Sequence, residues 1–297
     1  MRYASWPASP AERSFPAVAG RASGKATGDT IRNKTHRITR AWRWAKLLAH
    51  VAVALVLLRL VFPASSRDRR RRFYGWWSGR LLRALNIVPI VEGEVPPDAA
   101  RVVFVPNHVS WIDIFFISSI HPTRFIAKSE IREWPVAGWI AESVGTIFIH
   151  RARRHDTGRI NAVVHSALED GDCVGLFPEG TTTDGDRLLR FHSSLFEPAV
   201  ANSARVHPVA IRYEETDGTL CRSAAYVGEL TFAQSMGLVI RKRRIIARIR
   251  FAAPIEAGGL TRRELAAATE ASVASLLGLP RPGTKPGTAA GPPAEPR

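Results

Sequence analysis

Cysteine is almost absent from this chain of 297 residues, which contains only Cys173 and Cys221. Two cysteines so far apart cannot form the disulfide framework of a small secreted domain or the clustered ligands of a zinc site. They fit a protein that folds in a reducing cytosol. Cys173 lies in a strand-like apolar run, where a cysteine is usually a small core residue, and we therefore expect no thiol nucleophile and no bound metal.

A Gly-x-Ser-x-Gly elbow, the turn that presents the nucleophile of many serine hydrolases, is also missing. A serine hydrolase that pairs Ser110 or Ser129 with a histidine is still an alternative, and it would be labelled by a fluorophosphonate probe. No internal repeat is evident. Residues 85–279 are long enough for one domain with a sizeable core.

Acidic residues are scarce in the first part of the chain. Residues 1–83 contain 18 Lys and Arg against 3 Asp and Glu, whereas residues 84–297 contain 24 against 23. The basic residues flank an apolar stretch and do not line a folded face with interleaved aromatics. The high positive charge suggests a nucleic-acid-binding protein as an alternative. This hypothesis accounts for the charge and for no other feature, and we expect no nucleic-acid partner.

The apolar stretch is Ala45–Phe62, which is at the short limit for crossing a bilayer core of ~30 Å. Basic residues crowd both of its ends, so the positive-inside rule gives no preference. An interfacial helix, or a helical pair that dips into one leaflet, keeps both basic clusters near anionic lipids. We favour this monotopic arrangement on the cytoplasmic face of the cell inner membrane. A spanning helix is the alternative, and a cleavable signal peptide is disfavoured because no small-residue cleavage site follows.

The hydrophobic pattern divides the chain into four parts. Residues 1–40 are predicted to be a disordered basic tail, 41–84 a membrane anchor or interfacial helices, 85–279 the folded domain, and 280–297 a disordered tail. Strand-like runs at 102–105, 146–149, 173–177, 206–211, 224–228 and 245–251 alternate with helical patterns at 111–120, 134–142, 156–169, 192–202 and 261–277. This alternation predicts an α/β fold with a mixed sheet flanked by helices.

A histidine and a carboxylate occur where the first strand-like run stops. Residues 102–105 end in Pro106 and Asn107, and His108 and Asp113 follow. On one regular helix a separation of five residues places two side chains about 140° apart. If His108 lies in the turn and Asp113 in the first helical turn, the carboxylate can hold one imidazole nitrogen and leave the other free to accept a proton. The pair therefore predicts a general base.

The same segment also fits a capping box, with Ser110 as the N-cap and Asp113 at the third helical position. In that interpretation Asp113 only caps the helix.

A second polar turn follows the strand-like run that ends at Phe177. Glu179, Gly180 and Thr181 begin it, and Thr182 and Thr183 continue it. Glycine lets the backbone approach a ligand, and backbone amides with threonine hydroxyls can bind a phosphate. Glu179 would repel a phosphate and would help only by holding a cation or a substrate hydroxyl. An ordinary strand-to-helix turn is the alternative.

Two further segments complete the set. The strand-like run 146–149 is followed by Arg151, whose guanidinium would bind an anionic head group as a bidentate fork. The run 206–211 is interpreted as a core strand whose Pro208 marks an edge or a bulge.

Taken together, the four segments resemble the glycerolipid acyltransferase family, whose best-known members are the 1-acylglycerol-3-phosphate acyltransferases. The resemblance covers about residues 85–255. The family's motifs correspond here to Asn107–Asp113, Gly145–Arg151, Phe177–Thr181 and Val206–Ile211, and residues 127–139 resemble its connecting region. Four motifs in order are far more specific than any one of them.

The resemblance implies the family's fold and a membrane-associated O-acyltransferase. His108 would deprotonate a lyso-lipid hydroxyl, Asp113 would hold the imidazole, and the alkoxide-like oxygen would attack an acyl thioester directly. Lys128, Arg151 and the turn of Glu179, Gly180 and Thr181 would bind the acceptor's head group. No cofactor is implied; acyl-CoA or acyl-acyl carrier protein would be the co-substrate. The basic run 241–244 could hold coenzyme A phosphates, the acidic carrier protein or lipid head groups, or be a solvated loop.

The acceptor implied first is 1-acylglycerol-3-phosphate, with phosphatidic acid as the product. Many family members that use it have arginine and serine after the Glu-Gly-Thr triplet, where this chain has Thr182 and Thr183. The threonines, Asp184-Gly185-Asp186 and residues 191–196 also resemble the branch that acylates lyso-ornithine lipid. That acceptor is the alternative.

Overall fold

The computed structural model describes residues 35–96, 102–134, 137–149 and 156–283. Most of the two predicted tails lies outside the described residues.

Two long helices begin the described chain. Helix α2 (Arg37–Leu60) extends the predicted apolar stretch at its amino end, and α3 (Arg67–Ala84) follows after a short turn. The two helices pack together through His50, whose ring stacks on Trp77 with centroids 5.0 Å apart. α2 is long and apolar enough to cross a bilayer, but only 22% of its most apolar window is buried in the protein.

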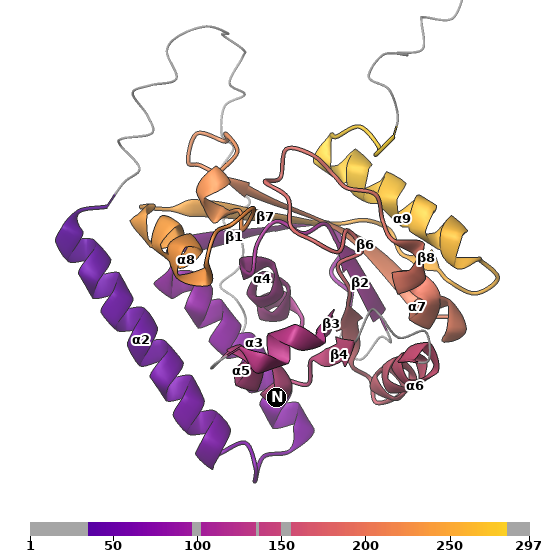
Figure 1. Cartoon of the computed structure of the whole chain (residues 1–297), viewed down its shortest axis with the longest axis horizontal. Helices are drawn as coiled ribbons and strands as arrows, with labels where there is room; N and C mark the ends of the chain where they lie inside the picture. Colours follow the sequence, from indigo (N-terminus) through magenta and orange to yellow (C-terminus); the bar gives the residue numbers. More distant parts are fainter. Residues whose placement is uncertain (1–34, 97–101, 135–136, 150–155, 284–297) are drawn as a thin grey trace, which may run out of the picture. The chain divides into compact units, whose positions relative to one another are not determined.

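A single mixed sheet forms the centre of the domain (Figure 1). Its order is β1-β7-β6-β2-β5-β3-β4, with β8 beside β6. The strands β6, β2, β5, β3 and β4 run parallel to one another, while β7 is antiparallel to β6 and parallel to β1. The strands are β1 (Ile87–Glu92), β2 (Val102–Pro106), β3 (Thr123–Lys128), β4 (Ile147–Ile149), β5 (Cys173–Gly175), β6 (Arg205–Glu214), β7 (Ile245–Phe251) and β8 (Ile255–Glu256).

Helices cover both faces of the sheet, which confirms the predicted fold class. Val102 and Phe104 of β2 belong to one core cluster, with residues of α2, α3, α4 and α8, whereas Val103 and Val105 belong to a second, with α6, α7 and α9. This alternation is what a strand buried on both faces requires. The helices are α4 (Ile112–Ile120), α5 (Ala137–Ser143), α6 (Asp156–Glu169), α7 (Glu197–Ala201), α8 (Phe232–Arg241) and α9 (Arg262–Leu277), and the short 3-10 turns are η1 (Ser129–Glu133), η2 (Ser193–Phe196) and η3 (Arg222–Ala224).

Three sequence-based assignments differ from the structure. Residues 224–228 do not form a strand; this apolar segment lies over the loop after β2, where Tyr226 donates its backbone N–H to the Val109 carbonyl. The strands β1 and β3 and helix α8 were not predicted. Pro208 is not at a sheet edge, because β6 lies between β2 and β7. Pro208 lies between the part of β6 that pairs with β8 and the part that pairs with β7. The N–H that proline lacks would therefore belong to neither set of inter-strand hydrogen bonds.

Candidate active site

The carboxyl ends of the parallel strands bring the predicted residues to one edge of the sheet. β2 ends at Pro106 and delivers Asn107 and His108, while β5 ends at Gly175 and leads to Glu179. Because parallel strands end on the same side, loops about 70 residues apart in the sequence become neighbours. Asn107 fixes β2 against β6: its side chain donates to the Ile211 carbonyl at 3.0 Å and accepts from the Ile211 N–H at 2.7 Å.

His108 and Asp113 meet as the spacing predicted. His108 Nδ1 lies 2.8 Å from Asp113 Oδ2. The carboxylate is completely buried, while the imidazole is 18% exposed. Since an ionised carboxylate only accepts hydrogen bonds, this contact places the proton on Nδ1 and leaves Nε2 as the basic nitrogen. Helix α4 begins at Ile112, so the turn does break the helix between the two residues.

Asp113 also organises the loop that carries His108. Its Oδ2 accepts the backbone N–H groups of Val109 at 2.8 Å and Ser110 at 2.9 Å. The capping alternative is thus partly right about the carboxylate, which bonds to backbone amides ahead of α4. It is wrong about Ser110, because Trp111 is the N-cap residue and the Ser110 hydroxyl has no partner among the described residues.

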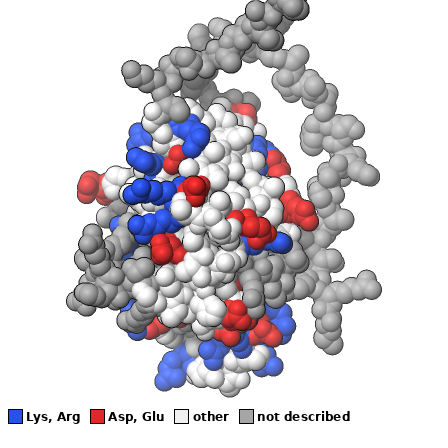
Figure 2. Space-filling model, turned by 90° about the vertical axis from the view of Figure 1, so that its right-hand side faces the viewer, with Lys and Arg blue, Asp and Glu red and all other residues white. Residues whose placement is uncertain are grey.

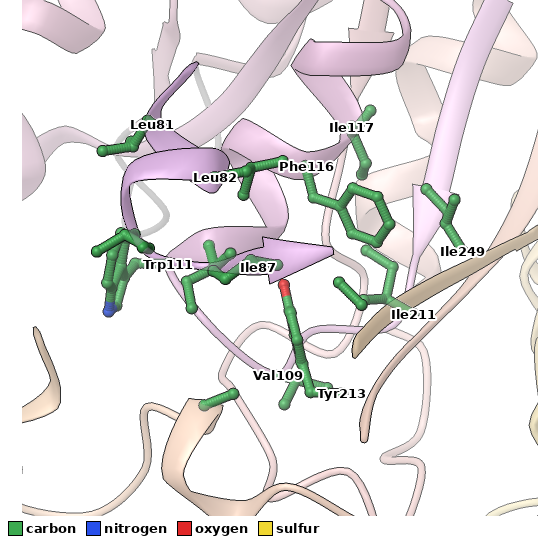
Figure 3. Packing of buried hydrophobic residues seen from close by; sticks show 14 of the residues in the cluster. Leu81, Leu82, Ile87, Val109, Trp111, Phe116, Ile117, Ile211, Tyr213 and Ile249 are labelled. Carbon is green, nitrogen blue, oxygen red and sulfur yellow. The ribbon is translucent and has the colours of Figure 1, made fainter. Parts of the chain in front are cut away.

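Tyr213 completes the carboxylate's set of donors from the far end of β6. Its hydroxyl donates to Asp113 Oδ1 at 2.7 Å, and its ring lies among apolar side chains such as Val109 (Figure 3). Burial and the neighbouring carboxylate raise the pKa of Tyr213 well above its ordinary value. The hydroxyl is therefore a permanent donor, and it fixes the orientation of the Asp113 carboxylate.

Phe177 holds the other side of the imidazole. The Phe177 and His108 rings are stacked, with centroids 3.8 Å apart and planes 20° apart, and Phe125 stacks behind Phe177. Asp113 fixes one edge of the His108 ring, while Phe177 fixes its plane.

Glu179 joins the loop that carries His108 to the segment that follows β5. Its Oε1 accepts the His108 backbone N–H at 2.7 Å, and its Oε2 accepts that of Leu189 at 2.9 Å. Burial is the largest influence on this carboxyl, and it raises the pKa of Glu179 to about 7 despite these two donors. Both carboxylate oxygens accept backbone N–H groups. Glu179 was predicted to contact the acceptor, and in the structure it positions the loop that carries His108.

The turn after Glu179 needs a left-handed backbone conformation at its second residue. Gly180 has φ +74°, a conformation that suits glycine. Thr181 is exposed, but the next two threonines are used inside the protein. The Thr182 hydroxyl donates to the Tyr226 carbonyl, and Thr183 donates its backbone N–H to the His108 carbonyl at 2.8 Å.

Of the two basic residues predicted to bind the head group, Lys128 and Arg151, the structure describes only Lys128. Lys128 is exposed at the end of β3, at the same edge as His108, where it pairs with Ile149 of β4. Arg151 lies outside the described residues.

Cys173 is at the opposite edge of the sheet from His108. It is buried at the start of β5, with its sulfur 3.5 Å from His121 Nε2.

Removal of the Tyr213 hydroxyl should impair catalysis without impairing acceptor binding. We expect Tyr213→Phe to lower kcat about tenfold, since a hydrogen bond to a charged group contributes roughly 1.5–3 kcal/mol, and to leave KM unchanged. Without this donor the Asp113 carboxylate is free to rotate away from His108 Nδ1, so the imidazole is held less well in the orientation that proton transfer needs. If Tyr213 has only a packing role, Tyr213→Phe should lower the free energy of unfolding, measured by denaturant, and leave kcat unchanged.

The buried Glu179 carboxyl should make stability depend on pH. Its pKa is higher in the folded protein, about 7, than in the unfolded chain, so the folded state binds more protons between about pH 4.5 and 7. Stability should fall as the pH rises through this window. We expect the free energy of unfolding of the wild type, relative to Glu179→Gln, to decrease by about 2–3 kcal/mol across it. Denaturant unfolding at several pH values measures this, and a constant difference would contradict the assignment.

Comparison with known proteins identifies the family to which this chain belongs. The family model described as Acyltransferase matches residues 88–212, which include the His108–Asp113 pair and the Glu179 turn. A protein named lyso-ornithine lipid O-acyltransferase from Pseudomonas aeruginosa is 38% identical over 241 residues, covering 79% of this chain and 92% of that protein. The chain belongs to the acyltransferase family. It is an enzyme of the acyltransferase type, as the motifs predicted.

Other relatives of this acyltransferase carry two kinds of name. A lyso-ornithine lipid O-acyltransferase from Brucella abortus is 36% identical, covering 76% of this chain and 90% of that protein. A 1-acyl-sn-glycerol-3-phosphate acyltransferase from Neisseria gonorrhoeae is also 36% identical, covering 65% and 76%. The crystal structure of PlsC from Thermotoga maritima, a 1-acyl-sn-glycerophosphate acyltransferase, shares the fold with a TM-score of 0.62 at 21% identity, covering 84% and 96%. The predicted fold is therefore confirmed.

Three positioning residues were given no role by the sequence pattern: Asn107, Phe177 and Tyr213. Asn107 and Phe177 each began a family motif but were assigned no contact. Tyr213 lies two residues beyond the apolar run 206–211, so extension of that strand to Glu214 would have brought it to the site edge.

Proposed function

We propose that this protein is a membrane-associated O-acyltransferase that transfers a fatty acyl group from a thioester to the hydroxyl of lyso-ornithine lipid. The observation that carries the chemistry is the His108–Asp113 contact at 2.8 Å, which leaves Nε2 as a base. The names of the relatives support the acyl-transfer reaction and a lyso-lipid acceptor.

The reaction begins when the acceptor hydroxyl donates its proton to His108 Nε2. Its oxygen attacks the thioester carbonyl, the tetrahedral intermediate collapses, and the C–S bond breaks. The imidazolium returns its proton to the thiolate, so an ester and a free thiol are the products. Asp113 stabilises the imidazolium through the Nδ1–H bond, while Phe177 keeps the ring in the plane that this transfer needs.

A charged cluster beside the His108 loop supports lyso-ornithine as the acceptor. Arg222 of η3 donates to Asp184 and, at 2.8 Å, to Asp186. Gly185 between them lies against Val109, the neighbour of His108. Lyso-ornithine lipid carries an ammonium and a carboxylate, and two carboxylates with one guanidinium complement a zwitterion better than a phosphate. This reverses the order of acceptors that the sequence motifs implied.

The second candidate acceptor is 1-acylglycerol-3-phosphate, which the Neisseria relative's name supports. Lys128, which is exposed at the end of β3, could bind its phosphate together with Arg151. Two groups of the turn favour this acceptor less than lyso-ornithine lipid. The Glu179 carboxylate would repel a phosphate, and the Thr182 hydroxyl already donates to the Tyr226 carbonyl.

An acceptor comparison tests the assignment. With labelled acyl-CoA or acyl-acyl carrier protein as donor, we expect a higher kcat/KM for lyso-ornithine lipid than for lysophosphatidic acid. Arg222→Gln should lower kcat/KM for lyso-ornithine lipid about tenfold and change the phosphate acceptor little. Arg205→Gln removes a similarly exposed ion pair, with Glu256, as a matched control. A preference for lysophosphatidic acid that Arg222→Gln leaves unchanged would reject lyso-ornithine.

The anchor is proposed to be monotopic, on the cytoplasmic face of the cell inner membrane. Large apolar side chains of α2 face outward, including Ile38, Leu48 and Leu60, while Leu47 and Leu58 are buried against the domain. A helix that packs along one side on its own domain can place only the other side in lipid. On the face shown in Figure 2, by contrast, acidic and basic residues are interspersed.

A further inference from the structure

A cavity between the start of α2 and the end of α8 is lined by arginine without acid. Arg37 and Arg40 come from the first turn of α2, Arg241 comes from the last turn of α8, and Trp44, Gly237 and Ile240 form the rest of the wall around about 380 Å³. This is within the size range of small-molecule sites.

Arg37 and Arg241 are exposed at the mouth of this cavity, and Arg40 is half-buried between them. Within the described part of the chain, none of the three arginine side chains forms an ion pair, and Arg40 Nε is buried without an acceptor. The first turn of α2 has no acidic residue, and His36 provides no side-chain cap. Like charges that line one cavity next to free helix N–H groups are stabilised by an anion.

The walls of the cavity are held in place. Arg43 donates to the carbonyls of Ile240, at 3.0 Å, and Lys242, which ties α2 to the end of α8. Lys242 is itself buried and paired with Glu215, so the run 241–244 is not simply a solvated loop. These contacts fix the spacing between the two helix ends that form the cavity.

The position of the cavity indicates the source of the anion. Ile38 and Trp42 on α2, next to Arg37 and Arg40, are 76% and 61% exposed and begin the outward apolar face of the helix. A ligand that reaches the cavity from this face comes from the membrane interface, where tryptophan such as Trp44 is also favoured. Arginine binds phosphate oxygens bidentately.

We propose that this cavity binds the phosphate of an anionic membrane phospholipid and so fixes the anchor helix to the catalytic domain. The site is separate from the acceptor site, and it does not depend on which lyso-lipid is acylated. α8 also contacts the catalytic loop, since Ser235 accepts from Trp111 Nε1 at 3.1 Å. The bound head group would therefore lie at one end of a helix whose other end supports the segment between His108 and Asp113.

A charge-conserving variant tests the proposal. Arg40→Lys with Arg241→Lys keeps the net charge but removes the planar forks. With the full-length protein and phosphatidylcholine vesicles that contain phosphatidylglycerol, we expect affinity about tenfold below the wild type, and equal binding to phosphatidylcholine alone. Diffuse attraction depends on charge and changes by about fivefold for each charge removed, so it predicts no loss. Unchanged affinity of the lysine variant would overturn the proposal.

Two controls distinguish a bidentate phosphate site from diffuse charge attraction and from misfolding. Arg69→Gln with Arg72→Gln removes two exposed charges of α3 outside the cavity, and should weaken binding only through charge, with an effect that disappears at high salt. Thermal unfolding in detergent establishes that all variants fold. If inorganic phosphate alone protects the wild type and not the lysine variant, while vesicles bind both equally, the ligand is a free anion and the lipid assignment is wrong.

Discussion

Alanine in place of His108 is expected to lower kcat by about 10²- to 10⁴-fold, the usual contribution of a general base. His108 is the residue whose Nδ1 is held by Asp113, which leaves Nε2 for the acceptor hydroxyl. The side chain is 18% exposed and lies at the edge of the sheet, so the variant should fold and bind vesicles like the wild type. Labelled acyl transfer in vesicles measures the loss.

A second histidine provides the matched control for this substitution. His165 on α6 is exposed and bonds to Asn202 at 2.6 Å, away from the strand ends that form the site. His165→Ala should retain wild-type kcat. Transfer at the wild-type rate by His108→Ala would reject the general-base assignment.

Asn in place of Asp113 should lower kcat by about 10²- to 10⁴-fold while preserving the fold. The amide oxygen can still accept from His108, Val109 and Ser110, and its NH₂ group can donate to the Tyr213 oxygen. The negative charge that stabilises the imidazolium is lost, and an amide can present the wrong group to Nδ1.

The control for Asp113→Asn is another buried carboxylate with a backbone donor. Glu270 on α9 accepts at 2.8 Å the N–H of Phe191, whose side chain belongs to the core on the other face of the sheet from Val109 and Tyr213. Glu270→Gln should cost stability, measured by denaturant unfolding, without a large change in kcat. An Asp113→Asn variant that unfolds at much lower denaturant would show a structural role in place of an electrostatic one.

The sequence predicted the contact between His108 and Asp113 because both residues lie on one short segment. The five-residue spacing and the break after the strand determine whether His108 and Asp113 can meet, and both are local. Tyr213 is 100 residues from Asp113, and the two meet only because β6 pairs with β2. A single strand pattern contains no record of which strand will lie beside it, so this donor could not be assigned.

Burial explains the remaining differences between prediction and structure. Glu179 follows a strand in a polar turn, which predicts a ligand contact, yet its oxygens accept backbone N–H groups from the His108 loop and from Leu189, later in its own loop. Residues 224–228 have the apolar composition of a strand because they cover the loop that carries His108. Helix α8 was missed although its capping box, Thr231 with Gln234, is visible in the sequence.

The dependence of thioester cleavage on the acceptor is the most direct test of transfer by His108. Purified wild-type protein in vesicles is incubated with an acyl thioester, with and without lyso-ornithine lipid or lysophosphatidic acid, and both free thiol and acylated lipid are measured. Direct transfer predicts one acylated lipid per thiol released and almost no thiol without acceptor. Thiol release at the same rate without acceptor would contradict transfer and identify the protein as a thioester hydrolase.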